Sequence, residues 1–155
     1  MPGTSSRFPA RKPLSHSRAF EPRSGSIYFI TLCAVPRGVN TLACDTVAPS
    51  LWQNVCFCHE RGDWFPLLFL VMPDHVHGLF SFPPEGEMRQ SVNAWKKFTA
   101  HALSVEWQRD FFDHRLRSDE SFEEKAAYIG ENPVRASLCE TAEAWPYVWR
   151  MNRYG

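Results

Sequence analysis

Two hydrophobic runs flank a short polar interruption near the middle of the chain. Residues 65–71 read Phe-Pro-Leu-Leu-Phe-Leu-Val and residues 79–82 read Leu-Phe-Ser-Phe, with Pro73 and Asp74 between the runs. Apolar runs of this length around a Pro-Asp pair are typical of two β-strands joined by a tight turn. The pattern therefore predicts a strand pair, with the second strand beginning at His75.

The rest of the chain alternates between strand-like and helix-like patterns. We expect, in order, a strand at 27–33, a helix from 49 to 61, the strand pair, a helix from 88 to about 106, a short strand or extended segment within 111–117, a helix from 122 to 132 ended by Pro133, and a tail that carries aromatic residues to 149. This βαββαβα order predicts an α+β fold, in which helices flank a ferredoxin-like antiparallel sheet.

Composition and charge divide the chain unevenly. Its 155 residues are 44% hydrophobic, which suits one domain with a proper core. The overall net charge is zero, yet residues 1–26 hold five basic residues against one acidic residue. These residues also lack periodicity and are rich in Ser and Pro. We therefore expect a flexible basic arm at 1–26 and a single domain with a C-terminal tail at 27–155.

The sequence also indicates where in the cell the protein is expected. No apolar run approaches the roughly 20 residues that a membrane-spanning helix needs, and residues 1–26 do not follow the order of a secretory signal. The five cysteines include no CxxC pair, and their odd number fits reduced thiols in a cytoplasm. Cys56, Cys58 and His59 are close in sequence, but they fall within a predicted helix. Positions two apart on a helix do not face each other, so core packing is the better interpretation.

His75 and His77 are the first candidates for chemistry. On a strand, residues two apart lie on the same face, so these imidazoles are expected roughly 6.5–7 Å apart with Val76 pointing into a core. Two imidazoles so placed can hold one divalent cation if another ligand completes the site. The alternative is that one or both histidines only cap a strand edge, and the spacing alone leaves both interpretations open.

The predicted helix at 122–132 offers a second half for this site. Tyr128 and Asn132 are four residues apart and so share a helical face. Asn132 has an amide oxygen that can bind a hard cation, and Tyr128 has a phenol oxygen that can act as a nucleophile. Two imidazoles, one amide oxygen and open positions suit Mg²⁺ or Mn²⁺ holding phosphate oxygens better than a closed zinc site. For Tyr128 alone, a half-buried structural aromatic is the alternative.

Several segments, in the same order, resemble a known family. Residues 72–77 (Met-Pro-Asp-His-Val-His) resemble the His-hydrophobic-His motif of the single-tyrosine HUH (IS200-like) transposases, and residues 128–136 (Tyr-Ile-Gly-Glu-Asn-Pro-Val-Arg-Ala) resemble their tyrosine helix. Residues 25–31, 107–108 and 111–117 are similar to the REP-associated tyrosine transposase branch. Ser137 stands where that branch commonly has glycine. The resemblance covers about residues 18–149.

The resemblance implies a ferredoxin-like or RRM-like sheet and a metal-dependent endonuclease and strand transferase that acts on single-stranded DNA near a hairpin, such as a REP-like palindrome. It implies that His75, His77 and Asn132 bind Mg²⁺ or Mn²⁺ and that Tyr128 forms a 5′-phosphotyrosine intermediate. It also implies a cytoplasmic, nucleoid-associated protein of bacterial type that acts as a monomer or a homodimer. We expect DNA contacts from Arg18, Arg23, Lys96, Lys97, His114, Arg117 and Arg135. For Lys96 and Lys97, a solvated helix face is the simpler interpretation.

Three other interpretations account for parts of the sequence. A histidine-triad nucleotide hydrolase would need a third histidine at position 79, which is Leu79. An RNA-binding module needs exposed aromatic residues on its central strands, and Tyr28 or Phe29 could serve. This interpretation does not explain the two histidines or the tyrosine helix. A non-catalytic, domesticated relative that binds hairpin DNA could carry the same residues as the enzyme, and only a cleavage assay separates the two.

Overall fold

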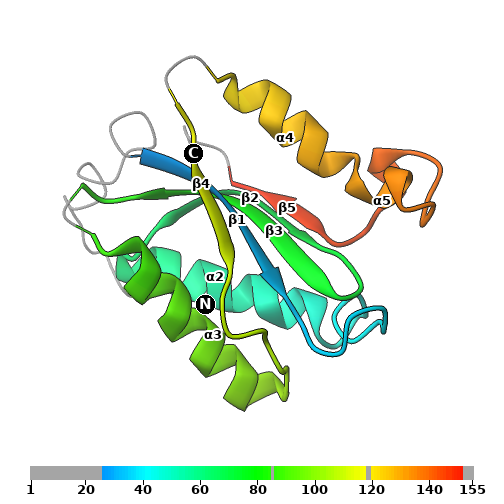
Figure 1. The fold of residues 1–155 in the computed structure, drawn as a ribbon, viewed down its shortest axis with the longest axis horizontal. Helices are drawn as coiled ribbons and strands as arrows, with labels where there is room; N and C mark the ends of the chain where they lie inside the picture. Colours follow the sequence, from blue (N-terminus) through cyan, green and yellow to red (C-terminus); the bar gives the residue numbers. More distant parts are fainter. Residues whose placement is uncertain (1–25, 85, 118–119, 152–155) are drawn as a thin grey trace.

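The computed structural model describes residues 26–84, 86–117 and 120–151. Its strands and helices keep the predicted order, with short elements added near the C-terminus (Figure 1). The elements are β1 (Ser26–Cys33), α2 (Ala48–Arg61), β2 (Phe65–Val71), β3 (His75–Phe82), α3 (Met88–Leu103), β4 (Phe112–Arg115), α4 (Phe122–Gly130), α5 (Asn132–Arg135), the 3₁₀ helix η1 (Ala142–Ala144) and β5 (Val148–Arg150). The predicted basic arm lies outside the described residues except for Ser26, which begins β1.

All strands belong to one antiparallel sheet in the order β4-β1-β3-β2-β5. The long strand β3 is central, and it pairs with β1 residue for residue from His75 to Phe82. The predicted α+β class and antiparallel sheet are therefore confirmed. The last strand was not predicted, because the region expected to be a tail supplies β5, which pairs with the far side of β2.

The two faces of the sheet bury different side chains. Helices α2 and α3 lie on one side of the sheet and α4 lies on the other (Figure 1). Alternate residues of β3 follow this division: Val76, Phe80 and Phe82 pack with α2 and α3, whereas Leu79 packs with α4. Val76 thus points into the core opposite the histidines, as predicted. The face under α2 and α3 is filled by a buried core, whereas the histidines lie on the α4 face.

Local sequence signals explain where two of the helices begin and end. Helix α2 has a proline in its first turn and ends at Gly62, whose φ of 97° is the left-handed conformation that glycine adopts most readily. Helix α4 begins after Ser121, whose hydroxyl accepts a hydrogen bond from the backbone N–H of Glu124. Both positions agree with the sequence-based expectation. No helix among the described residues is long and apolar enough to cross a membrane.

Two helix ends differ from the prediction. Helix α3 stops at Leu103 rather than near Glu106, because Ser104 adopts a left-handed φ of 57°. Helix α4 stops at Gly130, and a separate short helix begins at Asn132 and continues through Pro133. The prediction that Pro133 ends the helix is wrong, since proline fits the first turn of a helix, where its missing N–H is not needed.

Candidate active site

The histidine pair lies at the start of β3, on the face covered in part by α4. The ring centroids of His75 and His77 are 4.8 Å apart, and the ring planes are nearly perpendicular at 77°. The pair comes together because β3 begins at His75 directly after the tight turn, so that both rings share one face. The predicted placement of both imidazoles on the same face is therefore confirmed.

Each imidazole is held at its Nδ1 atom. Nδ1 of His75 lies 2.8 Å from Oδ1 of Asp74, and Nδ1 of His77 lies 2.8 Å from Oγ1 of Thr31. An ionised carboxylate can only accept, so Nδ1 of His75 donates its proton and the lone pair remains on Nε2. Neither Nε2 atom hydrogen-bonds to a described residue. A histidine anchored at one nitrogen and open at the other is the arrangement found in metal ligands.

Asp74 is itself held by the loop that follows β1. Its second carboxylate oxygen accepts hydrogen bonds from the Arg37 guanidinium at 2.9 Å and from the Gly38 backbone N–H at 2.7 Å. Burial alone would raise the pKa of Asp74, but the hydrogen bonds from Gly38, His75 and Arg37 outweigh burial and hold that pKa well below its usual range. Asp74 is therefore a fixed negative charge that orients His75.

The state of His77 also suits metal binding. Burial is the main cause that lowers the pKa of His77 to about 3, and the neighbouring His75 and Arg135 contribute to the same shift. At neutral pH the ring is then uncharged, which is the form that can donate a lone pair to a cation.

Tyr128 lies on α4 with 57% of its surface exposed. The Lys125 ammonium is 6.0 Å from the centre of its ring and 5.4 Å from the centre of the Phe29 ring. Phe29 in turn lies 5.5 Å from His77, measured between ring centroids. These contacts bring the phenol to the same side of the sheet as the histidine pair.

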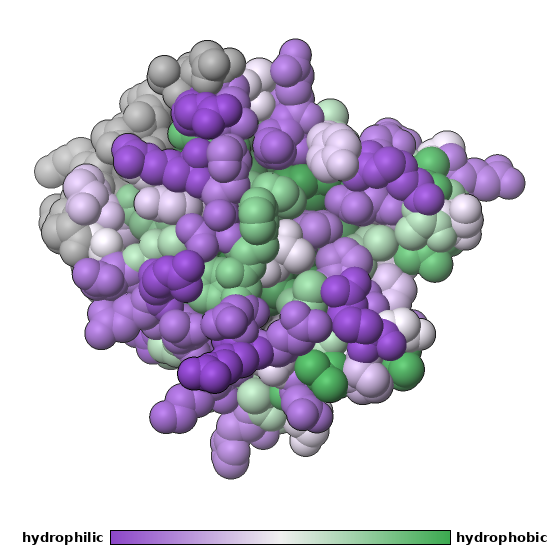
Figure 2. Space-filling view, in the orientation of Figure 1, coloured by the Kyte–Doolittle hydropathy of each residue, from purple (hydrophilic) through white to green (hydrophobic). Residues whose placement is uncertain are grey.

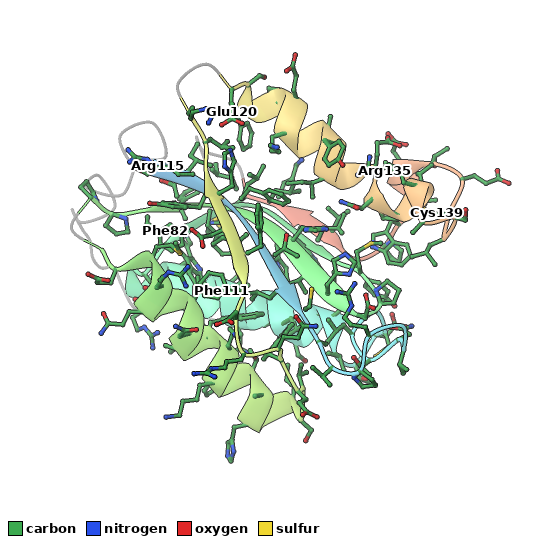
Figure 3. The ribbon with its side chains drawn as sticks, viewed as in Figure 1. Phe82, Phe111, Arg115, Glu120, Arg135 and Cys139 are labelled. Atoms are coloured by element: carbon green, nitrogen blue, oxygen red, sulfur yellow. The ribbon has the colours of Figure 1, made fainter. Side chains whose placement is uncertain are left out.

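Arg135 fixes the orientation of the tyrosine ring. Its guanidinium carbon lies 4.0 Å from the ring centroid of Tyr128, and one of its nitrogens donates to the Tyr128 carbonyl at 2.8 Å. Figure 3 shows Arg135 beyond the C-terminal end of α4, and Glu120 just before its N-terminal end. One face of the phenol is therefore covered by a cation.

Asn132 occupies a different setting from the predicted one. It begins α5 instead of ending α4, so it and Tyr128 do not share one continuous helix. Its amide nitrogen donates to the Ile129 carbonyl at 3.1 Å, which leaves its amide oxygen for another partner. That this oxygen meets the two Nε2 atoms at one cation remains a prediction.

The donor set fits a divalent ion of the predicted kind. In the described ranges, no group of three or more His, Cys, Asp or Glu residues is placed to hold a metal. The histidine pair would therefore need a further ligand of another type, such as an amide oxygen or a phosphate oxygen. Oxygen ligands beside two imidazoles leave Mg²⁺ and Mn²⁺ as suitable ions.

The residues expected to contact DNA have varied settings. Lys96 is buried, and its ammonium donates to the carbonyls of Gln108 and Arg109 at 2.8 Å each, so the expectation of a solvated face is wrong for this residue. Lys97 is exposed, as are Arg117 and Arg135. His114 shares a hydrogen bond with the Glu120 carboxylate. Arg18 and Arg23 lie outside the described residues.

Three residues at the site were missed by the sequence analysis. The contact of Thr31 with His77 and that of Lys125 with Phe29 carry no local signal, because each joins residues distant in the chain. Asp74 did carry one, since an acidic residue directly before a candidate ligand can orient that ligand. It was interpreted only as part of the turn.

The geometry defines a class of protein: an antiparallel α+β domain with two histidines, each anchored at Nδ1, and an exposed tyrosine on one side of its sheet. Residues 35–130 match the sequence model of the family described as "Transposase IS200 like". Because this match covers more than half of the chain, the protein belongs to the IS200-like transposase family.

Individual relatives agree with this assignment. A Haemophilus influenzae protein whose name marks it as a candidate REP-associated tyrosine transposase is 25% identical over 142 residues, which span 79% of this chain and 78% of the relative. The fold matches the structure of a REP-associated tyrosine transposase bound to a REP hairpin, with a TM-score of 0.71, 21% identity and coverage of 80% of this chain and 76% of the other. A candidate transposase of Deinococcus radiodurans matches with a TM-score of 0.50 at 20% identity, over 66% and 87% of the two chains.

Proposed function

We propose that this protein is a metal-dependent endonuclease and strand transferase that cuts and rejoins single-stranded DNA beside a hairpin. The observation that carries the proposal is the placement of an exposed tyrosine, flanked by two cations, on the same side of the sheet as two imidazoles with open Nε2 atoms. Membership of the transposase family supports DNA as the substrate. The hairpin bound in the structure with the same fold supports hairpin DNA as the partner.

The chemistry would fall to Tyr128. Its phenol oxygen loses a proton to solvent and attacks the scissile phosphorus, the bond from phosphorus to the 3′ oxygen breaks, and the leaving 3′ oxygen takes up a proton from solvent. The products are a 5′-phosphotyrosine and a free 3′-hydroxyl, and attack by a 3′-hydroxyl on that linkage reverses the step and joins strands. A divalent ion bound by His75, His77 and Asn132 would stabilise the charge that develops on the phosphate.

The other residues would orient these groups. Asp74 and Thr31 fix the two imidazoles, and Arg135 fixes the tyrosine ring. Lys125 and Arg135 place positive charge on the side where a phosphodiester must approach, which favours an anionic substrate.

The test is adduct formation with hairpin oligonucleotides that carry random single-stranded flanks, in the presence of Mn²⁺. The wild type should form a covalent DNA adduct whose phosphate maps to Tyr128, with a 3′-hydroxyl on the released fragment. Tyr128→Phe should form none, while it still binds the hairpin. Tyr147→Phe is the control, because Tyr147 donates its phenol proton to Asp45, a partner outside the site.

Each outcome has a separate meaning. An adduct that persists in Tyr128→Phe contradicts the role of this residue. Hairpin binding by the wild type without any adduct instead assigns the protein to the non-catalytic, domesticated hairpin binders.

A further inference from the structure

Four aromatic rings form a row across the α4 face of the sheet, from its edge to the histidine pair. Phe112 of β4 lies 5.8 Å from Phe29 of β1, Phe29 lies 5.5 Å from His77 of β3, and His77 lies 4.8 Å from His75, all measured between ring centroids. The strand register explains the row, because Phe112 pairs with Thr31 and Thr31 pairs with His77. The row spans two strand spacings, roughly 10 Å, from Phe112 to His77.

Phe112, at the outer end of this row, is exposed over 56% of its surface. It is uncovered because α4 packs against β2, on the far half of the same face, while β4 forms the edge of the sheet. Figure 2 shows hydrophobic residues in the middle of a largely hydrophilic face. Of the four residues of β4, only Phe112 is hydrophobic. The preceding residue, Phe111, points to the other side of the sheet and packs into the core there.

The rings nearer the site are already occupied. The Lys125 ammonium lies over Phe29, and the Arg135 guanidinium lies over Tyr128. Of the two phenylalanines in the row, Phe112 is therefore the exposed one, with no described cation over its ring. Glu120, in the described part of the loop that follows β4, is paired with His114 and with the Arg117 N–H.

An exposed flat ring beside a cation matches the chemistry of one nucleotide. A base stacks on the ring, and the phosphate of the same strand is attracted to the cation. Stacking also needs an unpaired base, since bases within a duplex already stack on one another. The row therefore fits a single strand that runs from Phe112 past Lys125 toward the histidine pair and Tyr128.

We propose that Phe112 is the stacking platform for an unpaired DNA base next to the scissile phosphate. This surface deepens the proposed function and rests on it, because the strand it holds is the one that Tyr128 would cut. Phe112 is a binding residue and takes no part in the bond changes.

The experiment measures the affinity for a hairpin oligonucleotide selected by this protein from the random-flank library. The Tyr128→Phe background is used so that no strand is cut during the measurement. Loss of one base–aromatic stack should weaken binding about 5- to 140-fold in Phe112→Ala. Phe112→Leu should weaken it similarly, because leucine keeps apolar area but has no flat ring, and Phe112→Trp should restore the affinity.

Phe98→Ala is the matched control. Phe98 is exposed to almost the same extent, 57%, but lies on α3, across the sheet from the proposed site. Both substitutions remove an exposed ring, so both should leave the thermal unfolding temperature nearly unchanged. Only the substitution at Phe112 should lower the affinity for DNA.

A second readout locates the base. Abasic substitutions are introduced one at a time along the single-stranded flank of the selected oligonucleotide. One position should weaken binding to the Phe112-containing protein and have no further effect in Phe112→Ala, because the same stack is then removed twice. That non-additive pair is a result that a purely structural role for Phe112 would not give.

Three results would overturn the proposal. If Phe112→Ala binds as tightly as Phe98→Ala while the wild type forms its adduct, Phe112 is not the platform and the proposed function stands. If the wild type selects no single-stranded hairpin, both the surface and the proposed function fail. If a concentration-dependent dimer is lost in Phe112→Ala while DNA affinity is intact, the exposed ring belongs to a contact between two copies of the chain.

Discussion

At the scale of single residues, the two histidines differ in what holds their Nδ1 atoms. His75 is anchored by the charged carboxylate of Asp74, and His77 by the neutral hydroxyl of Thr31. Asp74 also accepts from Arg37 and Gly38, so the geometry of His75 depends on the loop after β1. A cation bound at the pair would therefore be affected by residues that do not touch it.

Replacing Asp74 with Asn should weaken Mn²⁺ binding about 10- to 100-fold, as for other groups that orient a metal-binding histidine. Asparagine has nearly the same size, but it lacks the negative charge that accepts from Nδ1 of His75. Isothermal titration calorimetry measures the affinity. Asp63→Asn is the control, since Asp63 forms an ion pair with Arg61 at the end of α2. Equal Mn²⁺ affinity in the two variants would show that Asp74 does not orient a ligand.

Arg135 gives a second prediction at this scale. Arg135→Met and Arg135→Lys should both slow adduct formation roughly 10- to 100-fold, because a shift of the nucleophile by about 1 Å has effects of that size. Lysine keeps the charge but cannot lie flat over the Tyr128 ring. Mn²⁺ affinity should stay unchanged in Arg135→Lys, which keeps the positive charge that acts on His77. A normal rate in Arg135→Lys would mean that charge alone matters and that Arg135 does not position the ring.

At the scale of elements, a buried lysine joins α3 to the segment that leads into β4. The Lys96 ammonium donates to two consecutive carbonyls, those of Gln108 and Arg109, and lies 5.6 Å from the centre of the Phe111 ring. These contacts fix the segment immediately before β4. The placement of Phe112 at the edge of the sheet therefore depends in part on Lys96.

Lys96→Met should lower the free energy of unfolding by about 1–3 kcal/mol, because two carbonyls lose their donor while the apolar stem is largely kept. Lys97→Met, at the neighbouring exposed position, should change it by no more than about 0.5 kcal/mol. Urea unfolding followed by circular dichroism measures both. Equal effects of the two substitutions would contradict the structural role of Lys96.

The sequence predicted the elements with long patterns and missed those set by distant partners. The apolar runs around Pro73 predicted both central strands and the shared face of the histidines. The strand Val148–Arg150 is too short to show alternation, and it exists because β2 offers an edge for pairing. Lys96 is buried because its acceptors lie 12 and 13 residues further along the chain, which helical periodicity does not reveal.

At the scale of the whole molecule, the sheet has the larger hydrophobic core on one face and the candidate site on the other. Its α2–α3 face is filled by a core, and its other face is half covered by α4 and half open along β4 (Figure 1). The histidine pair and Tyr128 belong to this second face. The basic residues of positions 1–23 precede β1, whose Phe29 belongs to the aromatic row on that face.

Removal of residues 1–23 should weaken DNA binding for all sequences alike, because contacts to phosphates do not read bases. The slope of log K against log salt concentration should become shallower by about 0.7 for each single-strand phosphate that the shortened protein no longer neutralises. Fluorescence anisotropy over a salt series measures this, with the full chain as reference. An unchanged affinity and slope would mean that the basic residues of this segment do not contact DNA.

Residues of β3 pair one for one with residues of β1, so the side chains of β3 alternate between the two faces of the sheet. Its odd-numbered residues, including His75 and His77, face the candidate site, and its even-numbered residues face the core under α2 and α3. Adding or deleting one residue between His77 and Phe80, without a bulge, would turn every later side chain of β3 to the opposite face. Phe80 would then leave the core while the histidines kept their positions. Divergence in this strand is thus confined to exchanges of one side chain for another. The core side chains of β3 on one face of the sheet therefore constrain which of its residues can occupy the candidate site on the other face.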